Sequence, residues 1–255
     1  MAATGGITGR TYTEADILGH LYPRMKDEPL LNDQDELVIP VRMKDHPHFR
    51  RIGKASFGTR IGISENNPTH NECVRYLHEE LANPMNTRVS ISSYIFAEDR
   101  SREEQVIFST LPTSEYCWFL ESEARVAFDD QTYIQPDLAG RDVRRFFPRA
   151  SCPNIIIEVV RTHAPDENTF RRLYELSLAN TMIVFYFIAE GYRAGKLNNV
   201  RREQGLLTLR VSHYMLNGLP YKNGKATKVR QEDERTNDWY RYLSNSYFTA
   251  AKESA

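Results

Sequence analysis

The stretch NIIIEVV at residues 154–160, together with the segment 161–188, decides the fold. NIIIEVV is typical of a strand buried on both faces, because branched aliphatic residues fill it almost without interruption. A helix is predicted next, from Pro165 to about Ala179, and a second apolar strand, TMIVFYFI, covers 181–188. A strand, a helix and a strand in this order predict a parallel pair with a crossover helix, and hence an α/β core whose sheet is covered by helices.

Working outward from this stretch, the sequence predicts a series of further elements. A helix begins at Pro68, with Thr69 as its N-cap, and Asn83-Pro84 ends it. We also expect strands at 88–96, 105–110, 116–128 and 132–139, a strand or hairpin at 206–216, and a helix from Asp238 onward. The chain thus divides into an N-terminal extension or small lobe (1–67), a core (68–190) and a basic C-terminal extension (191–255).

Composition narrows the class of protein. The 255 residues are 40% hydrophobic and 26% charged, which is typical of a globular chain and not of a disordered one. No apolar run approaches the roughly 18 residues of a membrane helix, and the N-terminus lacks a basic segment followed by an apolar core. Three widely spaced cysteines predict reduced thiols in a cytoplasmic protein.

Positive charge is concentrated although the net charge is only −1. Residues 191–230 hold nine Lys and Arg against one acid, and residues 141–149 hold four Arg against one acid. Such a distribution fits local binding of a polyanion such as nucleic acid, and it also fits an unevenly charged solvated surface. The candidate nucleic-acid-binding residues are Arg144, Arg145, Arg201, Arg202, Lys222 and Lys225.

Two carboxylates stand where a buried sheet would exclude them. Glu158 interrupts the aliphatic strand, and Asp137 lies near the end of the strand before it. Two adjacent strand ends that each offer one acid can converge on a divalent cation, because Mg²⁺ takes one or two protein carboxylates and keeps its other positions for water and phosphate. The alternative is that Glu158 pairs with Arg161 or an arginine of the following helix, while Asp137 forms a turn.

The sequence runs from Gln135-Pro136-Asp137-Leu138 through a loop to IIEVV, and then to Thr162-His163, a helix and an apolar strand. This order of motifs and elements resembles the PD-(D/E)xK nuclease superfamily. Its competence-protein-like subgroup is the most similar, and His70 stands on a helix similar to those that open such domains. The resemblance covers roughly residues 68–190. It implies a restriction-endonuclease-like α/β core, in which a mixed central sheet is flanked by helices.

The resemblance also implies a metal site for Mg²⁺ or Mn²⁺. Carried over to this chain, Asp137 and Glu158 become metal ligands and catalytic residues, and the carbonyl of Val159 becomes the backbone ligand. A third acid is expected from an earlier segment, and the choice among its candidates stays open. These candidates are Glu72 on the first helix and Glu121 and Glu123 on the long predicted strand.

One position departs from the family pattern. The family's lysine stands two residues after the glutamate, where this chain has Val160, and strand alternation points Arg161 to the opposite face. The cation is therefore expected from the next helix, through Arg171 or Arg172, although arginine stays protonated and does not serve as a base. Thr162 or His163 is available to orient a water molecule.

The function expected from these features is metal-dependent hydrolysis of a nucleic-acid phosphodiester, with DNA favoured by the resemblance alone. The leading alternative is a catalytically inactive relative that binds nucleic acid or a protein partner, which the missing lysine favours. A structural or assembly protein with no nucleic-acid role is a third class. A homodimer is compatible with each of them, and a membrane partner is not expected.

Overall fold

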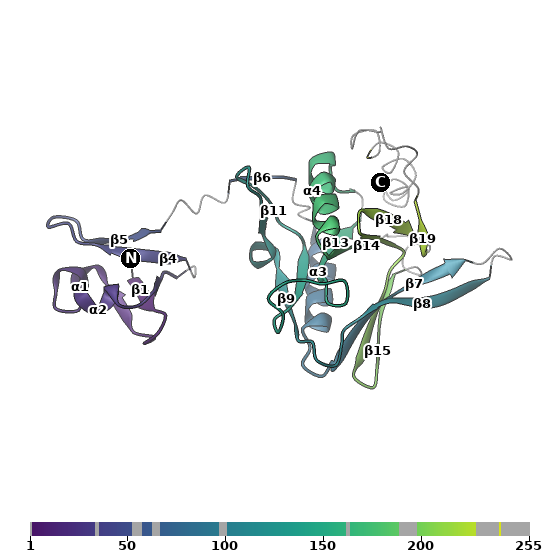
Figure 1. The fold of residues 1–255 in the computed structure, drawn as a ribbon, viewed down its shortest axis with the longest axis horizontal. Coiled ribbons are helices and arrows are strands. Elements are labelled where there is room, and N and C mark those ends of the chain that lie inside the picture. Colours follow the sequence, from purple (N-terminus) through teal and green to yellow (C-terminus); the bar gives the residue numbers. More distant parts are fainter. Residues whose placement is uncertain are drawn as a thin grey trace. The chain divides into compact units, whose positions relative to one another are not determined.

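The computed structural model describes residues 2–33, 36–52, 58–62, 67–96, 101–161, 164–188, 198–227 and residue 240 (Figure 1). The chain separates into two compact units, Met1–Thr59 and Arg60–Ala255. The second unit holds all of the candidate site residues predicted from the sequence. The predicted helix from Asp238 onward lies outside the described residues except for Tyr240, as do Thr162 and His163.

The first unit is a small sheet with two short helices. Its five strands lie in the order β2-β1-β3-β4-β5, and its core includes Tyr12, Ile17, Met25 and Leu30. Thr13 and Asp16 form a capping box at the start of α1, which fixes the first helical turn. The elements are β1 (Ala2–Gly5), β2 (Thr11–Thr13), α1 (Glu14–Leu18), α2 (Tyr22–Lys26), β3 (Leu30–Leu31), β4 (Leu37–Val41) and β5 (His48–Arg51).

A seven-stranded mixed sheet forms the centre of the second unit, in the order β19-β18-β17-β14-β13-β12-β9. Its strands are β9 (Tyr116–Leu120), β12 (Leu138–Asp142), β13 (Asn154–Val160), β14 (Thr181–Phe187), β17 (His213–Leu216), β18 (Leu219–Lys222) and β19 (Lys225–Ala226). The crossover helix α4 (Glu167–Leu178) joins β13 to β14, and these two strands pair in parallel, as the sequence predicts. The protein is therefore mixed α/β.

Two smaller sheets complete this unit. A four-stranded sheet has the order β15-β16-β7-β8, and a three-stranded sheet has the order β10-β11-β6. The remaining elements are β6 (Thr59–Arg60), α3 (Pro68–Leu81), β7 (Arg88–Phe96), β8 (Arg102–Ser109), η1 (Glu121–Ala124), β10 (Val126–Ala127), β11 (Thr132–Ile134), β15 (Asn199–Glu203) and β16 (Leu206–Arg210).

The aliphatic run of β13 is explained by a core on each face of the central sheet. Ile155, Ile157 and Val159 belong to the core cluster that includes the apolar side of α3. Ile156 and Val160 belong to the other cluster, which includes the apolar side of α4. Because successive strand residues alternate between faces, a strand with a core on both sides is apolar at nearly every position.

Several predicted boundaries are wrong for identifiable reasons. The segment 116–128 is not one strand, because Glu121 takes a positive φ of 39° and a single 3-10 turn follows β9. The segment 132–139 is also two strands, separated around Pro136, which has no N–H to donate. The N-cap of α3 is Asn67, whose side chain accepts a hydrogen bond from the N–H of Thr69. The segment 206–216 forms β16 and β17, which belong to different sheets.

Candidate functional site

The antiparallel register of β12 and β13 brings the two predicted carboxylates together. Leu138 lies opposite Ile157 in this pair. Asp137 comes just before this pair on one segment and Glu158 just after it on the other, so both stand at the same end of the ladder, and the charge of Asp137 acts on Glu158. Contact between the two segments is direct, because the N–H of Val159 donates a 2.8 Å hydrogen bond to Oδ2 of Asp137.

The Asp137 carboxylate is held from two sides. Its Oδ2 atom accepts the Val159 N–H and also lies 3.1 Å from Nε2 of His70, which is buried at the start of α3. Because an ionised carboxylate only accepts, His70 donates in this contact. Within the described part of the chain both hydrogen bonds fall on Oδ2, and the side chain keeps 22% of its surface exposed. Oδ1 is thus the atom of Asp137 that is free to meet a ligand.

Glu158 has an unfavourable environment for a negative charge. Burial raises its pKa well above the usual value, and the nearby charge of Asp137 raises it further, while Arg60 acts in the opposite direction. In β13, Glu158 and Asn154 are half-buried, and the other residues of the strand are buried. A divalent cation between the two carboxylates would offset both the burial and the mutual repulsion.

Arg60 is the cation near Glu158 that the sequence did not indicate. It stands on β6, which is fixed against β11 by a 2.8 Å hydrogen bond from the Ile61 N–H to the Tyr133 carbonyl. Its Nε atom is buried and has no hydrogen-bond partner among the described residues. No local pattern marks it, because its place near Glu158 depends on the pairing of β6 with β11 in the three-stranded sheet.

The arginines predicted to supply the cation lie on α4. Arg172 donates to Glu175 at 2.8 Å and also pairs with Asp130, and its guanidinium lies 4.4 Å from the centre of the Phe128 ring. These contacts tie α4 to the turn before β11. Arg171 is exposed on the same helix.

The three candidates for a third acid are placed differently. Glu121 follows β9, and its N–H approaches the carbonyl of Asp137 at 3.4 Å, while its side chain is exposed. Glu72 stands on α3 beside Cys73, whose pKa is raised to about 12 by burial first and then by the charges of Asp137 and Glu72. Across the described ranges, no three His, Cys, Asp or Glu side chains form a ready metal site.

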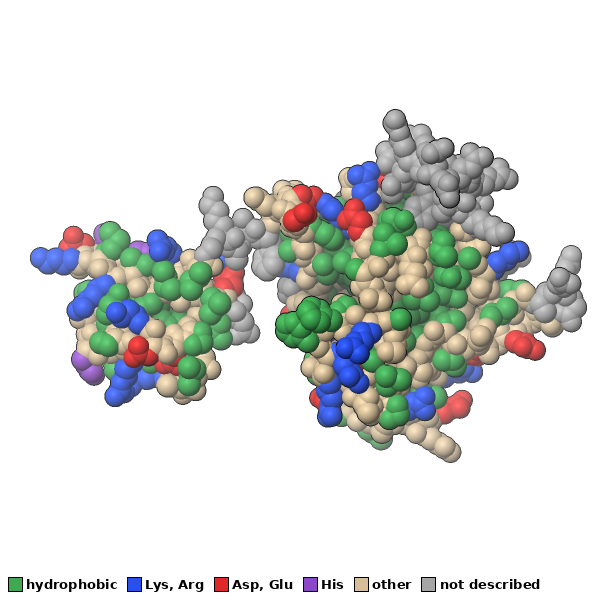
Figure 2. Space-filling view, viewed as in Figure 1, with side chains coloured by type: hydrophobic (Ala, Val, Ile, Leu, Met, Phe, Trp, Pro, Cys, Tyr) green, Lys and Arg blue, Asp and Glu red, His purple; other side chains and the backbone are tan. Residues whose placement is uncertain are grey.

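The predicted nucleic-acid-binding residues lie on separate elements. Arg201 and Arg202 both stand on β15, where Arg201 pairs with Glu104 and Arg202 pairs with Glu80. Lys222 and Lys225 face each other across the β18–β19 hairpin. Arg144 and Arg145 stand in the loop after β12. On the face drawn in Figure 2, Lys and Arg side chains of this unit form several separate groups and not one continuous strip.

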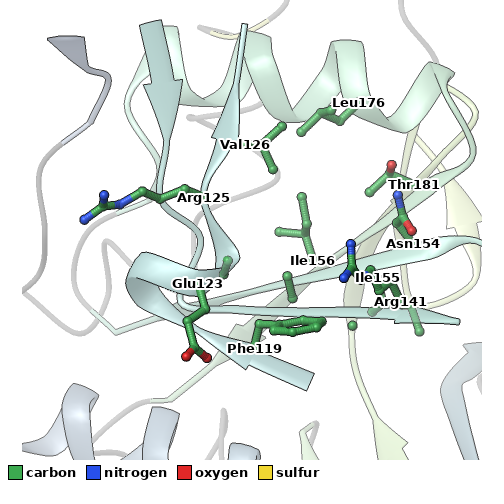
Figure 3. Close-up of a pocket in the computed structure, with 13 residues that line it drawn as sticks. Phe119, Glu123, Arg125, Val126, Arg141, Asn154, Ile155, Ile156, Leu176 and Thr181 are labelled. Atoms are coloured by element: carbon green, nitrogen blue, oxygen red, sulfur yellow. The ribbon is translucent and has the colours of Figure 1, made fainter. Parts of the chain in front are cut away.

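Glu123 lies at a cavity of about 250 Å³ on the α4 side of the sheet (Figure 3). The cavity is bordered by Arg141 and Ile156 of the sheet and by Leu176 of α4. Ile156 is two residues before Glu158, and therefore shares its face of β13. The cavity thus occupies the same side of the sheet as Glu158, further back along the strand.

Comparisons of the chain with family models, curated proteins and solved structures gave no match. In the portion of the chain that the structure describes, no helix has the length and apolar character needed to cross a bilayer.

Proposed function

We propose that the second unit is a metal-dependent nuclease with a core of the PD-(D/E)xK type, and that it hydrolyses phosphodiester bonds, with DNA as the preferred substrate. The observation that carries the proposal is the placement of two acids at one end of the β12–β13 ladder, where the Val159 N–H donates to Asp137 and the charge of Asp137 acts on Glu158. The pKa of Glu158 is raised by burial first and then by the charge of Asp137, and such shifts are common at functional sites, because folding stability alone gains nothing from them.

The pair fits a hard divalent cation. Oδ1 of Asp137 and the carboxylate of Glu158 are oxygen ligands of the kind that Mg²⁺ and Mn²⁺ prefer, and two protein carboxylates suffice for Mg²⁺ in phosphate chemistry. When bound, the ion would supply charge stabilisation at phosphorus and lower the pKa of a water molecule. Asp137 and Glu158 are the residues that would hold it.

The surrounding residues orient and balance this pair. His70 and the Val159 N–H fix Oδ2 of Asp137, so that the carboxylate cannot rotate freely. Arg60 lowers the pKa of Glu158 and so favours its ionised form. Val160, which stands in the lysine position of the family pattern, is buried in the α4-side core. Arg60 is therefore the residue that we place in the electrostatic role of the missing lysine.

The proposed compartment and partner rest on the cysteines and on the basic loop after β12. The three cysteines are free thiols, which supports a reducing cytoplasmic setting. The arginines in the loop after β12 support a polyanionic substrate.

Cleavage assays test the proposal. A labelled DNA substrate is incubated with the full chain in Mg²⁺ or Mn²⁺, and the wild type is compared with Asp137→Asn, Glu158→Gln and the matched surface control Glu103→Gln. We expect the first two variants to lose about 10³-fold or more of the cleavage rate, since transition-state charge stabilisation is removed, and the control to cut normally. Absence of cleavage by the wild type with either metal, or normal cleavage by both site variants, would overturn the proposal.

The second candidate function is a nuclease-fold protein that binds nucleic acid without cutting it. Two observations favour it: the valine at position 160 and the lack, within the described residues, of a three-residue metal cluster. It predicts oligonucleotide binding that is independent of divalent metal and of Asp137, together with no cleavage.

A further inference from the structure

Two phenylalanine side chains stand exposed at the tip of the loop between β12 and β13. Phe146 is 92% exposed and Phe147 is 69% exposed. Their rings contact each other edge to face, with the centroids 4.6 Å apart. Two adjacent aromatic rings in solvent are unfavourable in isolation, so such a patch marks an interaction surface.

The loop that carries these rings is anchored on both sides. At its start, Oδ1 of Asp142 accepts hydrogen bonds from the N–H groups of Glu115 (3.0 Å) and Arg144 (3.1 Å). At its end, Arg149 and Cys152 exchange two backbone hydrogen bonds of 3.1 and 2.9 Å. The rings are thus presented by a fixed loop, which lowers the entropic cost of binding through them.

The surroundings of the two rings are basic. A cavity of about 570 Å³ is lined by Phe146 together with Arg141, Arg144 and Arg145. The acid among them, Asp142, has only 1% of its side chain exposed, whereas Arg144 is 65% and Arg145 is 39% exposed. Glu115, half exposed, pairs with Arg144 at 2.9 Å. The charge that this loop presents to solvent is therefore predominantly positive.

The geometry points to this surface as a binding site for single-stranded nucleic acid, with the arginines on phosphates and Phe146 and Phe147 stacked on unpaired bases. This inference rests on the proposed function for its class of substrate. Bases in a duplex are already stacked on one another, so their faces are open to aromatic side chains only in single strands or locally unstacked positions. Guanidinium groups beside exposed rings match the alternation of phosphate and base along such a strand.

The surface is connected to the carboxylate site through β12. Arg141 and Asn154 line both this cavity and the one in Figure 3. Asp137 lies just before the other end of β12, and the five residues of this strand span roughly 16 Å. The loop and Asp137 therefore lie at opposite ends of β12, so a nucleic-acid strand held at the loop reaches Asp137 by running the length of β12.

Fluorescence anisotropy of a labelled 20-nucleotide single strand and of the matching duplex, without divalent metal, tests the inference. We expect the wild-type full chain to bind the single strand at least about tenfold more tightly than the duplex. Stacking of one base on one ring corresponds to roughly a 5- to 150-fold change in affinity. The double variant Phe146→Ala/Phe147→Ala is expected to weaken single-strand binding about 10- to 100-fold and to leave the salt dependence unchanged.

Three further variants sharpen the test. Arg144→Gln/Arg145→Gln is expected to weaken binding to both oligonucleotides and to reduce the salt dependence. Phe96→Ala removes another exposed phenylalanine, on β7, and is expected to bind like the wild type. Glu103→Gln, the surface control of the cleavage assay, is also expected to bind like the wild type.

The inference is overturned if the wild type binds neither oligonucleotide, if it binds both equally, or if the Phe146/Phe147 variant binds the single strand like the wild type. It is also overturned if that variant changes only the oligomeric state measured by light scattering, because the rings would then form a protein interface. Binding without cleavage refutes the nuclease and leaves this inference standing. Cleavage by the Phe146/Phe147 variant at the wild-type rate refutes this inference and leaves the nuclease standing.

Discussion

Glu158→Gln separates a metal-site carboxylate from a structural ion pair. Glutamine has nearly the shape of the protonated glutamate, and it removes the charge that burial and Asp137 disfavour. In the absence of metal, release of a buried charge that Arg60 offsets only in part is worth about 1–3 kcal/mol. For a unit of this size, Arg60–Ala255, this corresponds to a rise in Tm of roughly 2–12 °C.

The effect has a defined dependence on pH. Because the folded-state pKa of Glu158 lies above its unfolded value, wild-type stability is fully present at low pH and is lost as pH rises through the folded pKa. The Tm difference between Glu158→Gln and the wild type is therefore expected to be near zero in acid and to grow with pH. Circular dichroism melts in EDTA across a pH series measure this difference.

Divalent metal acts in the opposite direction and stabilises the wild type more than the variant. At a metal concentration of 100 times Kd, the wild type gains about 2.7 kcal/mol from binding, equivalent to roughly 5–11 °C in Tm, and Glu158→Gln gains little. Two outcomes would refute the reasoning. One is a variant that is less stable than the wild type at every pH, as a broken ion pair predicts. The other is a variant that Mg²⁺ or Mn²⁺ stabilises as much as it stabilises the wild type.

Three further predictions concern the same unit. Arg60→Gln removes the charge that lowers the pKa of Glu158, so the acidic limb of the pH profile of cleavage should move to higher pH; an unmoved limb would exclude Arg60 from this role. Gly140→Ala places a Cβ 2.5 Å from Cζ3 of Trp118. This overpacking should lower the free energy of unfolding, measured with denaturant, by about 1–3 kcal/mol. A variant as stable as the wild type would show that the ring moves aside. Cys73, with its pKa raised to about 12, should resist iodoacetamide at pH 8 in the folded chain and react in urea; equal rates by mass spectrometry would contradict its placement.

The core of the fold is readable from the sequence because its signals are local. The run 154–160, the helix after Asp166 and the run 181–188 each carry their own periodicity, and the crossover rule then sets their pairing. The strand expected over 116–128 failed because the alternation of residue types does not reveal the positive φ at Glu121.

The candidate site was predictable only in part. Glu158 was conspicuous because a carboxylate interrupts an aliphatic strand, and Asp137 became informative only in combination with it. Arg60 carries no such signal, since a strand of two residues, β6, has to pair with β11 before its side chain reaches the sheet. The exposure of Phe146 likewise depends on the loop anchors at Asp142 and Cys152, which are tertiary contacts.

Calorimetric titration of the full chain with Mn²⁺ tests most directly whether Asp137 and Glu158 share one cation. The wild type and the control Glu103→Gln should each bind one ion, and near the raised pKa of Glu158 binding should release a proton, seen as a dependence of the heat on buffer. Asp137→Asn and Glu158→Gln should both lose that ion. Absence of binding to the wild type, or one ion bound equally by all four proteins, would contradict the shared site.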